Sequence, residues 1–235
     1  MSGINQELRD KKYNEWARRN PTIVSIVFPL LVATYFFQEN TAELDEVRYV
    51  VGTLLSFGAI IPALLFFFQS SIRELSVLLV EKPLYAIFGR PAVNLMKKNN
   101  GGLSPQRKKR IMDKAQTAGI DMNYAGGKTM KEKKKNYQLV REAFEKIREE
   151  CRESSMVFEF NCTYGFFRNL SGGLIVDLLI CTGVEIVNCR LQLGIEAMLN
   201  VSFWILGSLL LFCIICAYFA AVRYAKRVYV IYDNL

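Results

Sequence analysis

The sequence predicts an all-α membrane protein with four transmembrane helices and a small, basic, helical cytoplasmic domain between the second and third spans. The first observation is a set of four long apolar runs, at residues 21–37, 49–71, 169–187 and 199–222. The second is that the stretch from Arg73 to Arg168 holds 20 Lys or Arg against 11 Asp or Glu, so the basicity is local. The third is that all basic segments fall on one side of a four-span chain, which places the N- and C-termini in the cytoplasm.

The N-terminal segment, residues 1–20, is polar and basic, and we expect it in the cytoplasm ahead of the first span at 21–37. With about 17 residues, that span is near the lower limit for crossing roughly 30 Å of hydrocarbon. The loop that follows is short and acidic, with Glu39, Glu43, Asp45 and Glu46 against Arg48. Because Lys and Arg are retained on the cytoplasmic side of short loops, this loop is expected outside.

The second span, residues 49–71, carries no charge between Val50 and Ser71. Its apolar pattern continues past the membrane, which predicts an amphipathic cytoplasmic extension of the helix as far as Pro83. Leu84, Ile87 and Phe88 follow, and this apolar group is typical of a short interfacial helix that lies on the bilayer surface.

The cytoplasmic domain, residues 72–168, is expected to contain two further helices. Ser104 followed by Pro105 favours a helix start, and Gly119 favours its end. A second helix is predicted over residues 130–154, because apolar residues recur there at three- and four-residue steps. This packing stripe consists of Tyr137, Val140, Phe144, Ile147 and Cys151. Its partner is either Ile111 and Ala115 of the preceding helix or another subunit.

The chain returns to the membrane through residues 156–167, where five aromatic side chains match an interfacial aromatic belt. A short strand is the alternative for this stretch. The third span covers residues 169–187 and is the least apolar of the four. The fourth covers residues 199–222, and residues 223–235 form a cytoplasmic tail that begins with Arg223, Lys226 and Arg227.

Residue content excludes several classes of enzyme. The chain has no histidine, which removes imidazole bases, Ser-His and Cys-His nucleophile pairs, and His-ligated metal sites. Cys213 and Cys216 have the spacing of a metal-binding pair but lie inside an apolar run. No paired carboxylates suited to acid–base chemistry stand out. We therefore predict a protein that is not an enzyme and uses no cofactor or metal.

Clustered cations mark the cytoplasmic domain as a candidate contact surface. They are Lys97, Lys98, Arg107, Lys108, Lys109 and Arg110, followed by lysines at residues 131 and 133–135. One interpretation is contact with the anionic inner leaflet of the bilayer, at roughly 1 kcal/mol per residue. A second is a binding site for an acidic protein partner, a nucleotide or nucleic acid. A third is an ordinary solvated face.

Asp177 is the most informative single residue, because it lies about eight residues into the third span. A carboxylate at that depth is costly in lipid and is expected to face protein or water. With Glu185 near the outer end and Asn188, it forms a candidate intramembrane polar or pore-lining set. In a homo-oligomer such a set forms an acidic ring along a cation pathway. The alternative is a hydrogen bond to a neighbouring helix.

No motif ties the chain to a family, but its layout of a few spans with a small cytoplasmic domain resembles membrane effectors and sensors of bacterial antiviral systems. That resemblance implies a bacterial inner (cell) membrane. We predict a non-enzymatic membrane effector or channel-like protein, expected to form a homo-oligomer, whose cytoplasmic domain senses a ligand or partner. The alternative is a membrane anchor or scaffold that recruits a cytoplasmic partner or an acidic ligand.

Overall fold

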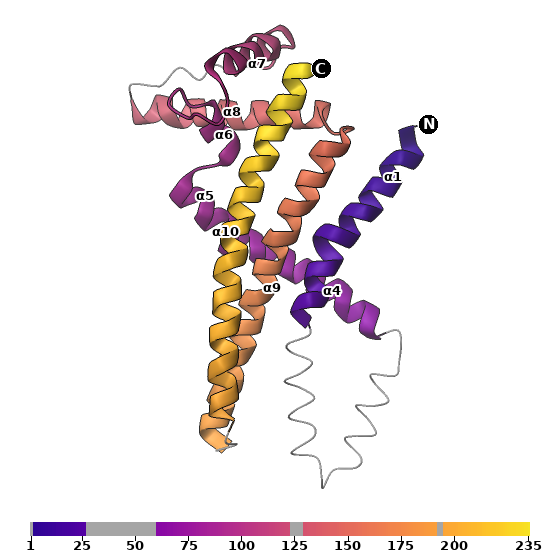
Figure 1. Ribbon diagram of the computed structural model, residues 1–235, viewed down its shortest axis with the longest axis vertical. Helices are drawn as coiled ribbons and strands as arrows, with labels where there is room; N and C mark the ends of the chain where they lie inside the picture. Colours follow the sequence, from indigo (N-terminus) through magenta and orange to yellow (C-terminus); the bar gives the residue numbers. More distant parts are fainter. Residues whose placement is uncertain (1, 27–59, 123–128, 192–194) are drawn as a thin grey trace. The chain divides into compact units, whose positions relative to one another are not determined.

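The computed structural model describes residues 2–26, 60–122, 129–191 and 195–235, and no strand occurs among them. Helices joined by short turns make up these ranges (Figure 1). The α-helices are α1 (Ser2–Tyr13), α4 (Ile60–Ser76), α5 (Lys82–Phe88), α6 (Pro91–Met96), α7 (Pro105–Thr117), α8 (Met130–Glu150), α9 (Ser155–Leu191) and α10 (Glu196–Asn234). Two π-helical segments, η1 (Asn14–Arg19) and η2 (Val77–Glu81), interrupt them. The all-α prediction is confirmed for the described residues, and the alternative of a strand at 156–167 is wrong because these residues lie in α9.

Two helices are long and apolar enough to cross a membrane, Ser155–Arg190 and Glu196–Asn234, and they contain the predicted third and fourth spans. Most of the predicted first span (21–37) and part of the second (49–71) fall within residues 27–59, outside the described residues. The described part of the chain therefore supports two apolar helices of membrane-spanning length, and the four-span arrangement remains a prediction.

The chain divides into two compact units. The first unit comprises Met1–Glu81 and Gly165–Ala217, and the second comprises Lys82–Tyr164 and Tyr218–Leu235. Helices α9 and α10 each run without interruption from one unit into the other. The sequence predicts residues 223–235 only as a cytoplasmic tail. In the structure they belong to the same compact unit as most of the basic domain.

In the first unit, α9 packs on two different sets of neighbours. Its contact with α10 is an apolar cluster made of Leu170, Leu174, Cys181, Ile195, Leu199, Leu206 and Cys213. Its contact with the N-terminal helix and α4 depends on glycines. A Cβ atom on Gly165 would lie 2.8 Å from the Ala17 Cβ, and one on Gly172 would lie 2.6 Å from the Ile72 carbonyl oxygen. Residues without a side chain at these points allow the helices to approach this closely.

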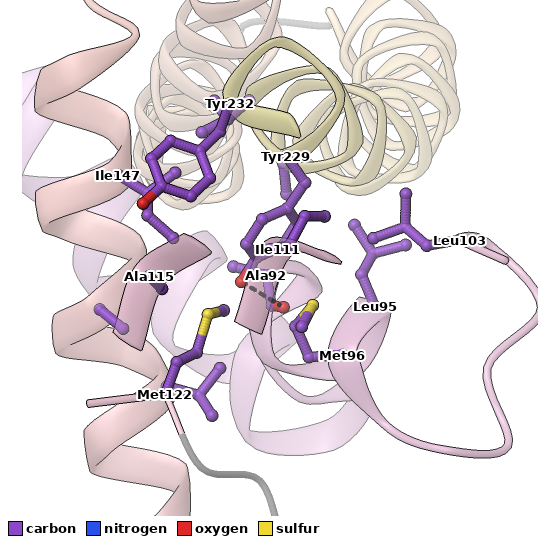
Figure 2. Close-up of a cluster of buried hydrophobic side chains, with 14 of the residues drawn as sticks. Ala92, Leu95, Met96, Leu103, Ile111, Ala115, Met122, Ile147, Tyr229 and Tyr232 are labelled. Atoms are coloured by element: carbon purple, nitrogen blue, oxygen red, sulfur yellow. Dashed lines mark hydrogen bonds between the residues drawn. The ribbon is translucent and has the colours of Figure 1, made fainter. Parts of the chain in front are cut away.

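The second unit is built around the C-terminal part of α10, which lies in its core (Figure 2). The Tyr229 hydroxyl is fully buried and donates a hydrogen bond of 3.1 Å to the Ala92 carbonyl oxygen. The residues of α10 in this cluster are Ala225, Val228, Tyr229 and Tyr232. Their three- and four-residue spacing is that of a helix with one buried face, so the tail is an integral helix of the unit.

The predicted stripe of α8 packs into the same cluster. Val140, Ile147 and Cys151 are buried in it, and Tyr137 and Phe144 are partly buried against it. Ile111 and Ala115 of α7 are members of the cluster as well. Within the described chain, the stripe is therefore covered by residues of the same molecule.

Local signals place both ends of α7 and the start of α8 close to where the sequence predicts them. The Ser104 hydroxyl accepts a hydrogen bond of 3.3 Å from the Arg107 amide, and Gly119 follows α7 with a φ of 72°. Thr129 and Glu132 form a reciprocal capping box at the start of α8. Helix α8 ends at Glu150, four residues before the predicted end at 154.

The helix that leaves α4 does not stop at Pro83, which corrects the sequence expectation. Helical structure continues through η2 and α5 as far as Phe88. In a regular α-helix a proline ring collides with the carbonyl group four residues earlier. The wider π-helical turn of η2 ends at Glu81, two residues before Pro83, and such turns relieve this conflict by changing the hydrogen-bond register.

Candidate functional site

Lys108, one of the predicted contact cations, is part of the interior of the second unit. The residue is 6% exposed, and its ammonium group donates hydrogen bonds of 2.6 Å to the carbonyl oxygens of Lys97 and Asn100. Burial lowers the pKa of this ammonium group. Lys108 therefore closes the turn between α6 and α7 and is not available to a ligand in this conformation.

Arg107 and Arg110 are engaged by a carboxylate from the other end of the unit. Arg107 Nε donates to Asp233 Oδ2 at 2.9 Å, and Arg110 donates through Nε at 2.9 Å and through Nη2 at 2.7 Å. The Asp233 side chain is 2% exposed. The hydrogen bond from Arg110 is the main cause that holds the pKa of Asp233 low, at about 2, although burial opposes it; Arg107 adds to the same effect. This pair of arginines fastens α7 to the end of α10.

Lys114 strengthens the same attachment. Its ammonium group donates a hydrogen bond of 2.8 Å to the Tyr232 carbonyl oxygen and lies 5.1 Å from the centre of the Tyr232 ring. A cation near the last carbonyl groups of a helix is favourable because the helix dipole is negative there. Sequence reasoning did not identify Lys114 or Asp233, since their partners lie more than a hundred residues away along the chain.

Six other predicted cations are exposed. Lys97, Lys98 and Lys109 are accessible on the second unit, as are Lys131, Lys134 and Lys135 on α8. The structure thus divides the predicted set into Lys108, Arg107 and Arg110, which hold the unit together, and Lys97, Lys98 and Lys109, which are available to a lipid surface or an acidic partner.

Asp233→Asn is expected to destabilise the second unit, by about 1–2 kcal/mol at neutral pH, because charge-assisted hydrogen bonds at a buried carboxylate are lost. The folded pKa of Asp233 lies below its ordinary value of about 4, so its contribution is complete above that pH and disappears as the pH falls toward 2. Thermal unfolding of the purified protein in detergent, measured at several pH values, checks this. The difference in Tm between wild type and variant should shrink from pH 6 to pH 3; a constant difference would contradict the assignment.

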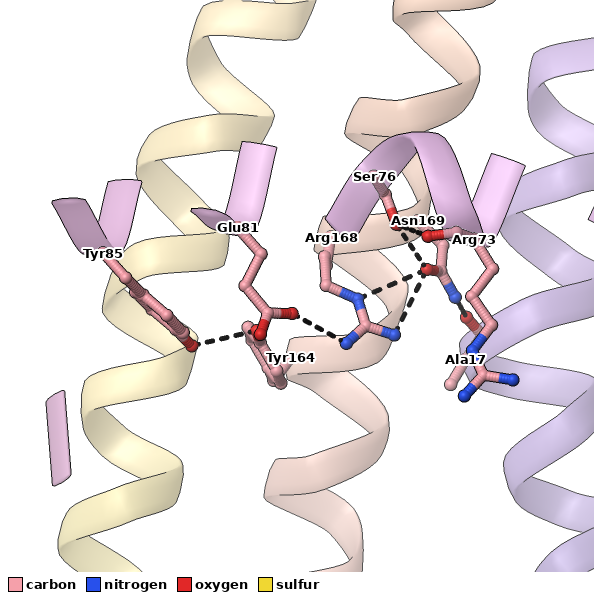
Figure 3. A network of polar contacts seen from close by, with 8 residues as sticks. All are labelled: Ala17, Arg73, Ser76, Glu81, Tyr85, Tyr164, Arg168 and Asn169. Carbon is pink, nitrogen blue, oxygen red and sulfur yellow. Dashed lines mark hydrogen bonds and ion pairs between the residues drawn. The ribbon is translucent and has the colours of Figure 1, made fainter. Parts of the chain in front are cut away.

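Hydrogen bonds around Asn169 join three segments of the first unit that are far apart in sequence (Figure 3). We call this group of contacts the polar crossing. Asn169 Nδ2 on α9 donates to the Ala17 carbonyl oxygen in η1, and Ser76 Oγ at the end of α4 donates to Asn169 Oδ1 at 3.1 Å. Asn169 and Ser76 are buried. Both amide atoms of Asn169 are thereby satisfied, which makes this residue a three-way connector between the N-terminal helix, α4 and α9.

An ion pair lies beside this crossing. Arg168 Nη1 donates to Glu81 Oε2 at 3.0 Å, and the two side chains are 14% and 21% exposed (Figure 3). Glu81 is the last residue of η2, and Ala17 lies in η1, so both π-helical segments meet α9 within one turn of Asn169. Segments of π-helix are rare and frequently accompany functional sites, which makes this junction a candidate site in the first unit.

The predicted intramembrane polar residues occupy different environments. Asp177 is 2% exposed, Glu185 is half-buried, and Asn188 is 1% exposed. Asn188 Oδ1 accepts a hydrogen bond of 3.4 Å from the Ile195 amide, so Asn188 ties α9 to the residue that precedes α10. Its Nδ2 has no partner among the described residues. Asn188 therefore has a structural role in the hairpin, while Asp177 is a buried carboxyl group in the middle of a candidate span.

The described residues contain no group of His, Cys, Asp or Glu that is able to hold a metal ion. Burial, assisted by Glu150, raises the pKa of the Cys151 thiol to about 11, so that this cysteine is a poor nucleophile. Comparison with known protein families, with curated proteins and with solved structures found no match for this chain. Functional conclusions therefore depend on the chemistry of the chain alone.

Proposed function

We propose that the protein is a non-enzymatic integral membrane effector, channel-like in character, whose second unit senses a ligand or partner. The observation that carries this proposal is the continuity of α9 and α10. Each helix starts or ends in the core of the basic second unit and continues into an apolar stretch of membrane-spanning length. A helix transmits displacement along its axis because its backbone hydrogen bonds resist bending, so rearrangement of the second unit reaches the apolar stretches directly.

Asp177 supports the channel-like part of the proposal. Ionisable residues inside apolar spans are expensive, and they commonly mark ion or proton pathways. Asp177 lies on α9 with its side chain covered by the first unit. In a homo-oligomer that opens during activation, copies of this residue form an acidic ring that concentrates cations.

The finer expectations belong to the same proposal. We infer four spans with both termini in the cytoplasm, and a homo-oligomer in a bacterial inner membrane whose anionic inner leaflet meets the exposed lysines. The resemblance of the layout to membrane effectors of bacterial antiviral defence makes a regulated, toxic ion flux the first activity to measure.

Asp177→Asn is expected to lower cation flux about tenfold, because a charged lining raises the local cation concentration by about that factor. The measurement is potassium release from liposomes that contain purified protein, compared with wild type. Glu159→Gln is the matched control, since Glu159 is an exposed carboxylate on the same helix outside the predicted third span. Wild-type protein without flux would refute the channel-like function, and equal flux in wild type and Asp177→Asn would remove Asp177 from the pathway.

A second candidate function is a membrane anchor or scaffold that recruits an acidic cytoplasmic partner or ligand. The exposure of Lys97, Lys98 and Lys109 favours it, because these three cations are accessible on the second unit. Replacing all three by glutamine and measuring retention of a nucleotide or an acidic peptide by the purified protein tests this function. Unchanged retention would exclude these lysines as the contact surface.

A further inference from the structure

The second unit exposes large apolar side chains on two helices that contact each other, α5 and α10. Ile87 and Phe88 at the end of α5 are 73% and 55% exposed, and Phe219 on α10 is 56% exposed. The ring of Phe88 lies 5.2 Å from that of Tyr218, which joins the two helices, and the rings of Tyr218 and Phe219 are 6.2 Å apart. We call these residues, Ile87, Phe88, Tyr218 and Phe219, the α5 apolar surface.

The orientation of α5 is fixed by contacts on its other sides. Gly89, with a φ of 75°, ends the helix, and Asn94 Nδ2 donates a hydrogen bond of 2.6 Å to the Phe88 carbonyl oxygen. The hydroxyl groups of Tyr85 and Tyr164 are 3.0 Å apart, which ties α5 to α9. These contacts oppose rotation of α5 about its axis. Ile87 and Phe88 therefore stay exposed and cannot turn toward the core of the unit.

The place of this surface along α10 indicates what covers it. Phe219 lies near the end of the apolar run 199–222, and the first cation after that run is Arg223. Tyrosines also gather here: the rings of Tyr164 and Tyr224 are stacked at 6.5 Å. Aromatic side chains followed by cations mark the boundary between hydrocarbon and headgroups at the end of a membrane span.

Charge complementarity favours an anionic lipid surface over other occupants. Lys82 begins α5 and Arg90 follows its end, and Arg223 and Lys226 follow the apolar run of α10. Cations at the inner leaflet interact favourably with acidic headgroups, while apolar side chains enter the acyl region roughly 5–10 Å deep. A second copy of the chain would bring these like charges together.

We propose that the α5 apolar surface inserts into the headgroup–acyl boundary of an anionic bilayer and anchors the second unit to the membrane. This inference rests on the proposed membrane function, and it adds a membrane contact by α5, which is not one of the spanning helices, beside the end of the fourth span on α10. Insertion of α5 fixes the position of the second unit at the bilayer surface. Because α9 and α10 continue from this unit into the predicted spans, the lipid surface then affects both helices.

Quenching of tryptophan fluorescence by brominated lipids tests the proposal. The vesicles are phosphatidylcholine with one quarter phosphatidylglycerol, with bromine either near the headgroup end or near the middle of the acyl chains. Single-tryptophan proteins are made from the full chain by replacing Trp16 and Trp204 with phenylalanine and adding Phe88→Trp or, as a second probe, Ile87→Trp. Gln138→Trp, at an exposed position of α8, is the matched control.

We expect both α5 probes to be quenched more strongly by the shallow bromines than by the deep ones, by about twofold. The Gln138 probe should be quenched much less than either, because lysines near it on α8 contact headgroups without carrying the helix into the acyl region. A fourth protein that retains only Trp204, which is 70% exposed within the predicted fourth span, reports the membrane assignment separately. Quenching of Trp204 without quenching of either α5 probe would overturn the anchoring proposal alone and point to a protein partner on this surface. No quenching of Trp204 would overturn the membrane function as well.

Discussion

Gly172→Val is expected to disrupt the first unit, with a loss of about 3 kcal/mol or more of stability. A Cβ atom at this position would lie 2.6 Å from the Ile72 carbonyl oxygen and 3.1 Å from the Ser76 Cα. Both contacts are with the backbone of α4, which cannot move aside as a flexible side chain does. The helices must separate, and separation also lengthens the hydrogen bond between Ser76 and Asn169. Thermal unfolding in detergent, followed by circular dichroism, measures the effect.

The control for this prediction is Gly183→Ala on the same helix. A Cβ at Gly183 meets nothing within 4 Å, so the substitution should leave the Tm unchanged or raise it through the better helix propensity of alanine, by up to about 1 kcal/mol. Gly172→Ala should already lower the Tm. Equal behaviour of Gly172→Ala and Gly183→Ala would mean that α9 and α4 do not pack as closely as described.

Tyr229→Ala is expected to cost about 3–5 kcal/mol, because it leaves a cavity in the core of the second unit. For a unit of this size the corresponding fall in Tm exceeds about 10 °C. Tyr229 is fully buried and contacts α8 through Phe144, whose ring lies 5.3 Å away. The measurement is thermal unfolding with the near-ultraviolet signal of the tyrosines, which reports on this core.

Two conservative variants measure the contribution of each tyrosine hydroxyl to stability separately from that of its ring. Tyr229→Phe removes the hydrogen bond to the Ala92 carbonyl oxygen and should cost about 1 kcal/mol. Tyr232→Phe should be neutral or slightly stabilising, because the buried Tyr232 hydroxyl has no partner among the described residues. A larger loss for Tyr232→Phe than for Tyr229→Phe would contradict the arrangement of α10 in the core.

Local patterns in the sequence predicted the helices of the basic domain well. Ser104 and Gly119 delimit α7 as expected, and the stripe of α8 is buried or half-buried. These signals are reliable because capping and amphipathic burial depend on residues within one or two turns. The same kind of signal was present in α10, where Ala225, Val228, Tyr229 and Tyr232 repeat at helical spacing. The cations that begin this stretch are also typical of a cytoplasmic flank, so the sequence alone favours a tail as much as a packed helix.

The cationic set was predicted as one surface, and folding separates its members. Lys108 turns inward to two carbonyl groups, and Arg107 and Arg110 bind Asp233. No property of residues 107–110 distinguishes these roles, because the partner carboxylate is supplied by the end of α10. Lys97, Lys98 and Lys109 retain the exposure that the contact hypotheses require, as do Lys131, Lys134 and Lys135 on α8.

The sequence alone determined that the chain is helical, that its charge is concentrated between apolar runs, and where most helices of the basic domain begin and end. These properties follow from hydropathy, helical periodicity and capping, all of which act over short distances along the chain. The tertiary structure decided that the C-terminal helix forms the core of the basic unit and that Asn169 connects three helices. Both depend on partners brought together from distant parts of the chain, and close packing and hydrogen-bond geometry select such partners only in the folded protein.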